Sequence, residues 1–259
     1  MEKWDRNVPA GLKRTGKWDI CPAGHERGEI AAARNLHLLV DAEHSYINPG
    51  SSLVALAMMA VFNQKRPVVA NTYQCYFKRA LETLKLELDV TESLGACFAV
   101  KLVRGAYLER ERELDSTSTC ESHAKTGENY HRVLDQALLH AKKVGPDRCL
   151  VITATHNEDT IRHSVLRLLE LGLDPTAGHV VFAQIYGMAE QISMPLEGYV
   201  PAHAGYLVYK SVPMGTLNQV LPYLARRAAE NRSVLHGARK ERELLQRELI
   251  WRLTSRFQR

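Results

Sequence analysis

Six short apolar runs alternate along the chain with longer segments that have helical periodicity. The runs are Leu36–Val40, Val68–Ala70, Phe98–Val103, Leu150–Ala154, Val180–Phe182 and Leu207–Tyr209. Near-continuous apolar runs of this length are typical of strands that are buried on both faces of a parallel sheet. Because helical segments separate the runs, the pattern predicts an α/β fold with parallel strands.

The intervening segments place apolar residues three and four positions apart, which is the spacing of one helix face. This spacing predicts helices over Arg79–Leu94, over Glu128–Val144 and from Ile161 to a stop at Gly172. The apolar stretch Leu53–Phe62 is too short to cross a bilayer, so we expect a buried helix there. The charge-rich segment Val234–Phe257 predicts an amphipathic helix that either covers the fold or contacts a membrane.

Each predicted strand is apolar until its carboxyl end and then turns polar. The residues that follow the six strands are Asp41–Glu43, Asn71–Gln74, Arg104–Tyr107, Thr155–Asn157, Gln184 and Lys210–Ser211. Polar loops after strands are common, but in a (β/α) barrel these ends form the active face. Six such ends in succession, with acidic, amide, basic and aromatic side chains, favour a functional site over ordinary loops.

Composition and charge exclude several other classes of protein. A length of 259 residues suits a single (β/α) barrel domain. The net charge of +5 is spread along the chain without a reader motif, so nucleic-acid binding is not indicated. The five cysteines are scattered and lack CxxC pairs, which predicts reduced thiols. No His, Cys or carboxylate spacing indicates a metal site, and no GxGxxG motif indicates a dinucleotide site.

The segment from Thr216 to Glu230 predicts a helix with chemistry on one face. Thr216-Leu-Asn-Gln219 has the form of a capping box, and the core stripe is formed by Val220, Leu221, Leu224 and Ala228. The opposite face carries Tyr223, Arg226, Arg227 and Glu230. Two adjacent guanidiniums can clamp a carboxylate, and Glu230 can brace one of them. The alternative is a solvated helix with ordinary ion pairs.

Five of these segments, in order, resemble the signature segments of the proline dehydrogenase family. They are Leu39–Glu43 (LVDAE), Asn71–Tyr76 (NTYQCY), Lys101–Tyr107 (KLVRGAY), Ala154–Asp159 (ATHNED) and Leu221–Asn231 (LPYLARRAAEN). The resemblance divides the chain into an N-terminal segment, residues 1–35, and a barrel domain with a C-terminal helix, residues 36–259. It implies a (β/α)8 barrel of the TIM type that binds FAD, oxidises an imino acid and passes electrons to a quinone.

The resemblance also implies a location and possible membrane contact. Family members of this kind are mitochondrial, on the matrix side of the inner membrane, or have a bacterial equivalent. The segment Met1–Gly16 mixes basic and acidic residues and does not indicate a transit peptide.

Residue roles follow from the same resemblance. The implied substrate contacts are the carboxylate clamp Arg226 and Arg227, the pocket residue Asp41 and the ring-packing Tyr107. The implied flavin contacts are Gln74, Lys101 near N5, and Gln184. Arg104, Gly105 and Ala106 would line the cofactor, and Thr155, His156 and Asn157 would contact its adenosine diphosphate part. Glu230 would brace the arginines or the cofactor.

Ser211 bears on which imino acid is oxidised. The ordinary members of the family usually have Tyr at this position, whereas the hydroxyproline-oxidising branch has Ser. A serine leaves room for the hydroxyl of trans-4-hydroxyproline and can hydrogen-bond to it. A buried hydroxyl without a partner costs about 1–3 kcal/mol, so this difference predicts a preference for hydroxyproline. Oxidation of L-proline, with neutral drift at this position, is the alternative.

The chain also departs from the family pattern. A closed barrel has eight strands and six are found, and no candidate appears for the family lysine on the second strand. A non-catalytic truncated form of the enzyme is therefore a second hypothesis. A third is a barrel aldolase or lyase, for which Lys101 is the candidate Schiff-base residue. The segment Leu196–Gly205 predicts an expanded loop before the last strand.

Overall fold

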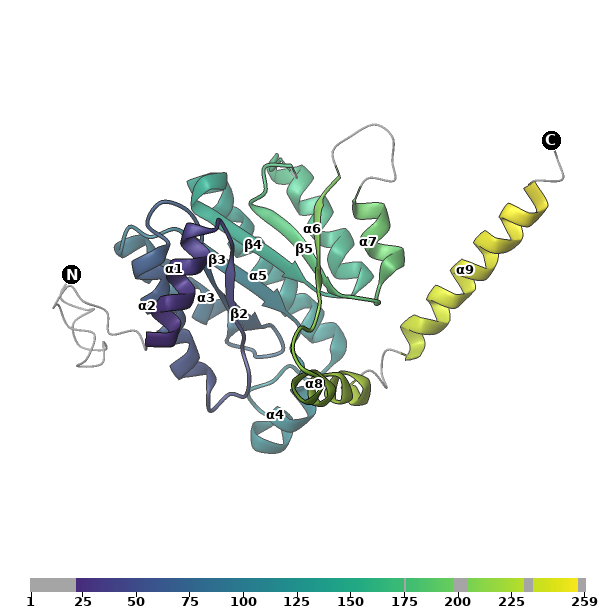
Figure 1. Cartoon of the computed structure of the whole chain (residues 1–259), viewed down its shortest axis with the longest axis horizontal. Helices are drawn as coiled ribbons and strands as arrows, with labels where there is room; N and C mark the ends of the chain where they lie inside the picture. The colour runs from purple at the N-terminus through teal and green to yellow at the C-terminus, as the bar shows by residue number, and fades with distance from the viewer. Residues whose placement is uncertain (1–21, 175, 198–204, 231–234, 256–259) are drawn as a thin grey trace.

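A six-stranded, wholly parallel sheet forms the centre of the protein (Figure 1). We analysed a computed structural model that describes residues 22–174, 176–197, 205–230 and 235–255, without the side chains of residues 226, 228–230, 235–241 and 255. The strands are β1 (Leu38–Val40), β2 (Val69–Gln74), β3 (Phe98–Val103), β4 (Cys149–Ala154), β5 (Val180–Ile185) and β6 (Leu207–Ser211). They lie in the sheet in their order along the chain, and the curled sheet is six strands of a (β/α)8 barrel.

Helices follow the strands in the order expected of an α/β barrel. They are α1 (Pro22–Ala33), α2 (Asn48–Phe62), α3 (Ala80–Ser93), α4 (Leu108–Asp115), α5 (His123–Val144), α6 (Glu158–Leu171), α7 (Glu190–Leu196), α8 (Leu217–Glu230) and α9 (Leu235–Ser255). Ser122 caps α5 and Asn157 caps α6 through side-chain oxygens, as polar residues at these positions do. In Figure 1, α9 stands apart from the sheet.

The two faces of the sheet have different surroundings. On the outer face, Tyr73, Phe98, Val151 and Phe182 pack with helix residues such as Tyr130 in the main core. On the inner face, a second cluster consists of strand residues alone, namely Ala70, Ala99, Leu150, Ile152 and Val181. Because successive strand residues point to opposite faces, the sequence position of each polar residue decides which face it reaches.

The structure confirms the predicted α/β fold and shows how far the strands extend. Phe98–Val103 is a strand over the predicted range, but β2 continues to Gln74, β5 to Ile185 and β6 to Ser211. The apolar runs ended too early because polar residues at these strand ends still form ladder hydrogen bonds, as the pairing of Gln74 with Val103 shows. Residues 198–204 of the predicted expanded loop lie outside the described residues.

Two expectations about burial are wrong for the described residues. In α2, Ala55, Met58 and Met59 are buried, but Leu53 and Val54 are exposed, so one face alone is buried. In α8, Leu221 and Leu224 of the predicted core stripe are also exposed. The buried face of α2 packs against β2, whereas the described part of the chain does not cover Leu221 and Leu224 of α8.

The four described cysteines are free and buried, in agreement with the predicted reduced thiols. None of the described helices has an apolar stretch of sufficient length to span a membrane.

Buried histidines should make the fold sensitive to acid. Burial is the first cause that lowers the pKa of His131, His140, His156 and His179, which are buried or half-buried. In each case the unfolded chain binds a proton more readily, so stability is present above a pH of about 6.5 and is lost as the pH falls through the folded-state pKa. Burial raises the pKa of Glu87, so this carboxyl group favours the folded state as the pH falls. It is one group against several histidines.

We therefore expect the melting temperature to fall between pH 7.5 and pH 5.5. Circular dichroism melts across this range will test the expectation, since most surface carboxylates titrate at lower pH. A melting temperature that is constant or rises on acidification would contradict it.

Candidate active site

The loop after β1 is cross-linked to the segment after β3 by three consecutive contacts. Asp41 forms an ion pair with Lys101, whose side chain is 16% exposed on β3. Tyr107 donates a hydrogen bond from its hydroxyl to Glu43 over 2.5 Å. These contacts bring together the predicted substrate residues Asp41 and Tyr107 and the predicted flavin residue Lys101 at the carboxyl ends of adjacent strands.

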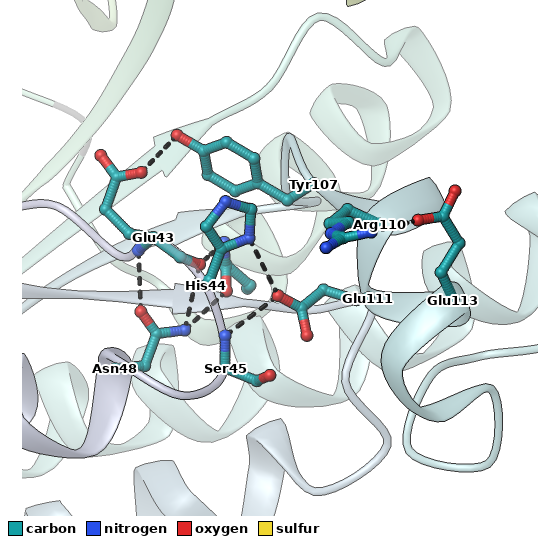
Figure 2. Close-up of polar contacts among 9 residues, drawn as sticks. Glu43, His44, Ser45, Asn48, Tyr107, Arg110, Glu111 and Glu113 are labelled. Carbon is teal, nitrogen blue, oxygen red and sulfur yellow. Dashed lines mark hydrogen bonds and ion pairs between the residues drawn. The ribbon is translucent and has the colours of Figure 1, made fainter.

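The third contact is made by a buried carboxylate on α4 (Figure 2). Glu111 is 1% exposed and accepts a hydrogen bond from the backbone N–H of Ser45 over 3.0 Å. It also lies 3.3 Å from Nδ1 of His44, whose ring packs against Tyr107 with a centroid distance of 4.5 Å. Glu111 thus fixes both the loop and one side of Tyr107.

Gln74 links the same loop to β2. Its Nε2 donates to the carbonyl of Glu43 over 3.0 Å, and its Oε1 accepts from Asn48 over 2.9 Å. Asn48 in turn accepts from the backbone N–H of Glu43 over 2.7 Å. Both ends of the Gln74 amide are therefore fixed in orientation, which suits a group that presents defined donors and acceptors to a flat ring.

Gly105 and Ala106 form the turn between Lys101 and Tyr107. Gly105 has a φ of +114°, and a Cβ at this position would lie 1.8 Å from the ring of Tyr76. Glycine is required here for two reasons, because the backbone conformation disfavours side chains and the buried Tyr76 leaves no room. The turn carries the chain from the inner face towards Tyr107.

Alternation divides the predicted site residues between the two faces of the sheet. Lys101 lies two positions after Ala99 and Gln74 lies four positions after Ala70, so both point to the inner face. Ser211 pairs with Ile185, which lies two positions after the inner-face residue Ala183, so Ser211 points to the inner face as well. Arg104, Thr155 and Gln184 lie an even number of positions after the outer-face residues Leu102, Val151 and Phe182, so they point to the helix layer. The structure therefore brings part of the predicted set together on the inner face and places the rest behind it.

Arg104 lies between α5 and α6. Its guanidinium donates to the carbonyl of His123 over 2.6 Å and contacts Thr160 over 3.5 Å. Burial lowers the pKa of Arg104, but nearby groups that include Asp159 partly offset this effect. Thr155 accepts from the backbone N–H of Asn157, which itself caps α6 by accepting from Thr160.

Gln184 and His156 also have defined partners. Gln184 is buried, accepts from Ser193 over 3.1 Å and lies 3.4 Å from the carbonyl of Thr155. His156 accepts the backbone N–H of Ile185 at Nε2 over 3.0 Å. These contacts join the loop after β4 to the end of β5, because β4 and β5 are neighbours in the sheet.

The helix that carries the predicted carboxylate clamp is present as α8. Gln219 accepts from the backbone N–H of Thr216 over 3.0 Å, which is one half of the predicted capping box. The guanidinium of Arg227 lies 5.5 Å from the centroid of the Tyr223 ring, within cation–π range. The side chains of Arg226 and Glu230 lie outside the described residues, so their roles stay predictions.

Several residues of this site were missed by sequence reasoning. They are His44, Asn48, Glu111 and Ser193, and Lys210 was noted at a strand end without a role. Glu111 sits in a charged segment, LERERELD, in which nothing separates the buried carboxylate from the exposed ones. Only tertiary contact identifies it. Among the described residues, no group of His, Cys, Asp and Glu is arranged to hold a metal ion.

The ion pair of Lys101 bears on the lyase hypothesis. A Schiff-base lysine must be available as a neutral amine in a desolvated pocket. Lys101 instead faces the carboxylate of Asp41. This arrangement suits an orienting cation and disfavours a nucleophile.

Glu111→Leu should destabilise the protein by about 1–3 kcal/mol, because a backbone N–H that loses its buried acceptor bears the full desolvation cost. Glu113→Leu is the matched control, since Glu113 lies on the same helix but is exposed and pairs with Arg110. Urea unfolding of both variants will test the prediction. Equal midpoints for the two variants would show that Glu111 does not anchor the loop.

Comparison with known proteins identifies relatives over most of the chain. The family model for proline dehydrogenase matches residues 26–240. The chain is 47% identical over 228 residues to hydroxyproline dehydrogenase of Xenopus laevis, which covers 86% of this chain and 48% of the relative. It is 43% identical to proline dehydrogenase 1, mitochondrial, of Homo sapiens, over 86% of this chain and 37% of the relative.

Solved structures show the same fold. Proline utilization A from Bdellovibrio bacteriovorus matches with a TM-score of 0.66 at 23% identity, over 81% of this chain and 22% of that one. Proline utilization A from Bradyrhizobium japonicum matches with a TM-score of 0.65 at 24% identity, over 81% and 21%. The chain spans about half the length or less of the curated relatives named above.

Proposed function

The chain belongs to the proline dehydrogenase family, and from this premise we propose that it carries the imino-acid oxidation site of an FAD-dependent dehydrogenase. The observation that carries the proposal is the cross-linked group on the inner face. Asp41, Lys101, Gln74 and Tyr107 converge there from three strand ends through direct or loop-mediated bonds. In barrel enzymes the carboxyl ends of the strands form the active face.

The residues present fit a flavin. On the inner face at the level of Gln74, Ala154 pairs with Ala183 and both pack with the inner cluster, while Val103 and Tyr209 are the register partners on either side. Small residues leave space for a planar ring, and the fixed amide of Gln74 and the ammonium of Lys101 flank that space. A cofactor site is expected to have an apolar surface with a few polar groups at fixed positions around it.

In this proposal the protein binds and orients, and the cofactor performs the redox chemistry. Bound FAD supplies the acceptor for the hydride that leaves the ring carbon next to nitrogen. Arg226 and Arg227 hold the substrate carboxylate, and Tyr107 packs beside the ring. Asp41 supports the polar network through Lys101. With hydroxyproline the product would be a hydroxylated pyrroline-5-carboxylate, formed as the ring nitrogen releases a proton to solvent, and a quinone would take up the electrons.

We assign trans-4-hydroxy-L-proline as the preferred substrate because of Ser211. Ser211 ends β6 on the inner face and its side chain is exposed there, so space remains beside it. Hydroxyproline dehydrogenases of Xenopus laevis and Bos taurus are among the relatives of the chain, at 47% and 43% identity. Because proline dehydrogenase of Homo sapiens is also 43% identical, identity alone does not separate the two substrates.

The proposal extends to location. Three relatives, from Homo sapiens, Bos taurus and Caenorhabditis elegans, are named as mitochondrial. We place the protein on the matrix side of the inner membrane, with peripheral contact to the bilayer that holds the quinone.

The opposing hypothesis is a non-catalytic form of the enzyme, and it predicts a protein that does not bind FAD.

The purified chain should show an oxidised-flavin absorbance spectrum, directly or after FAD is added. Under anaerobic conditions this spectrum should bleach on addition of trans-4-hydroxyproline, and more slowly with proline. The matched negative control is Lys101→Met, which removes the ammonium beside the ring space. A protein that stays colourless with added FAD would favour the non-catalytic hypothesis.

Ser211→Tyr should lower kcat/KM for hydroxyproline about fivefold or more beyond its effect on proline. The larger ring fills the space for the substrate hydroxyl, and a hydroxyl left without a partner costs about 1–3 kcal/mol. Ser211→Ala is the control that removes the hydrogen bond but keeps the space. Steady-state kinetics on both substrates provide the measurement. Equal losses on the two substrates would refute the role of Ser211.

A further inference from the structure

The turn after β5 is fixed at three points by different parts of the chain. The backbone N–H of Ile185 donates to Nε2 of His156 over 3.0 Å. The backbone N–H of Tyr186 donates to the carbonyl of Ser211 over 3.0 Å. Lys210 donates to the carbonyl of Met188 over 3.0 Å. The turn therefore connects the loop after β4 directly to the end of β6.

Lys210 uses its whole hydrogen-bonding capacity within this region. An ammonium has three donors. Besides the carbonyl of Met188, the Nζ of Lys210 reaches Ser193 over 2.6 Å and Glu190 over 3.0 Å. Its side chain is 20% exposed. Three acceptors match three donors, so Lys210 suits a structural anchor and not a substrate contact, although it precedes Ser211 directly.

The anchor extends to the predicted cofactor residues. Ser193 receives the Lys210 bond, and its one hydroxyl proton faces two acceptors, Oε1 of Gln184 at 3.1 Å and the carbonyl of Ala189 at 3.0 Å. Lys210 is also the register partner of Gln184 across the β5–β6 ladder. A single cation thus holds the turn and α7, and it reaches the Gln184 amide through Ser193.

His156 has a defined protonation form in this arrangement. A ring nitrogen that accepts a backbone N–H carries no proton, so the imidazole is neutral with its proton on Nδ1. Burial, and then the charge of Lys210, lowers the pKa of His156, which keeps the ring neutral near pH 7. The group that His156 offers to a ligand is consequently a neutral N–H donor.

We propose that Lys210 is a positioning residue, which holds the turn Ile185–Met188 and, together with neutral His156, fixes the end of β6 that carries Ser211. The geometry of the anchor stands on the hydrogen bonds alone. Its consequence for substrate choice rests on the proposed function. The two parts can be separated because the first can be measured without cofactor or substrate.

The first experiment is amide hydrogen exchange by NMR on the cofactor-free Lys210→Met variant. Protection of the Ile185 and Tyr186 amides should fall about tenfold or more, because loss of the anchor opens the turn. Lys78→Met is the matched control, since Lys78 pairs with Glu121 on the surface, and it should leave both amides unchanged. Unchanged protection in Lys210→Met would overturn the proposal.

A second pair of variants keeps the test decisive if Lys210→Met does not fold. Gln at position 156 can place an acceptor near the position of Nε2, whereas Asn is too short to reach Ile185. Ile185 protection should therefore persist in His156→Gln and be lost in His156→Asn. Equal protection in the two variants would overturn the role of His156. In Ser193→Ala, which removes one of the three acceptors, the Ile185 and Tyr186 amides should lose part of their protection.

The functional readout is the ratio of kcat/KM for hydroxyproline to that for proline. A variant that is merely less stable loses activity on both substrates equally, but a displaced Ser211 changes the ratio. We expect Lys210→Met to lower the ratio about threefold or more. An unchanged ratio in an active variant would overturn the link to Ser211. If the unmodified chain oxidises neither substrate, the proposed function fails and the exchange experiment alone decides the positioning role.

Discussion

The parallel ladder is the constraint on which the rest of the structure depends. Its register, with β3 paired to β4 over six residues, fixes the level of every strand end. Its pleat then sends alternate side chains to the inner face and to the helix layer. Lys101 and Arg104 differ by three positions and so lie on opposite faces, one beside Asp41 and the other between α5 and α6. A shift of one residue would exchange the two faces.

Much of this was predictable from sequence, and the reasons are local. Apolar runs and helical stripes depend on spacing, so the α/β order and the strand Phe98–Val103 were found correctly. The carboxyl ends of the strands were also identified, although the runs ended too early at Ala70 and Phe182. What could not be predicted depends on neighbours in space. Glu111 is buried and Glu113 is exposed within one helical segment, and only the loop at Ser45 distinguishes them.

Sequence resemblance does not predict which face of the sheet a candidate site residue points to. The resemblance gives Gln74 and Gln184 similar roles as flavin contacts. In the structure Gln74 is tied to the β1 loop on the inner face, whereas Gln184 is tied to Ser193 in the helix layer. The two amides therefore lie in different surroundings, and their roles towards a flavin stay predictions.

This division suggests that the inner face takes its geometry from bonds behind it. The strands occur in the sheet in chain order, so each strand end is positioned by the segments just before and after it. The loop that bears Asp41 is held by Glu111, and the strand end that bears Ser211 is held through the turn that Lys210 anchors. Glu111 acts from α4 on the loop after β1, whereas Lys210 precedes Ser211 on β6 and is tied to it through the turn after β5. A site assembled from such links depends on the packing between βα units, because the bond of Ser45 to Glu111 and the bond of Ile185 to His156 each join different units.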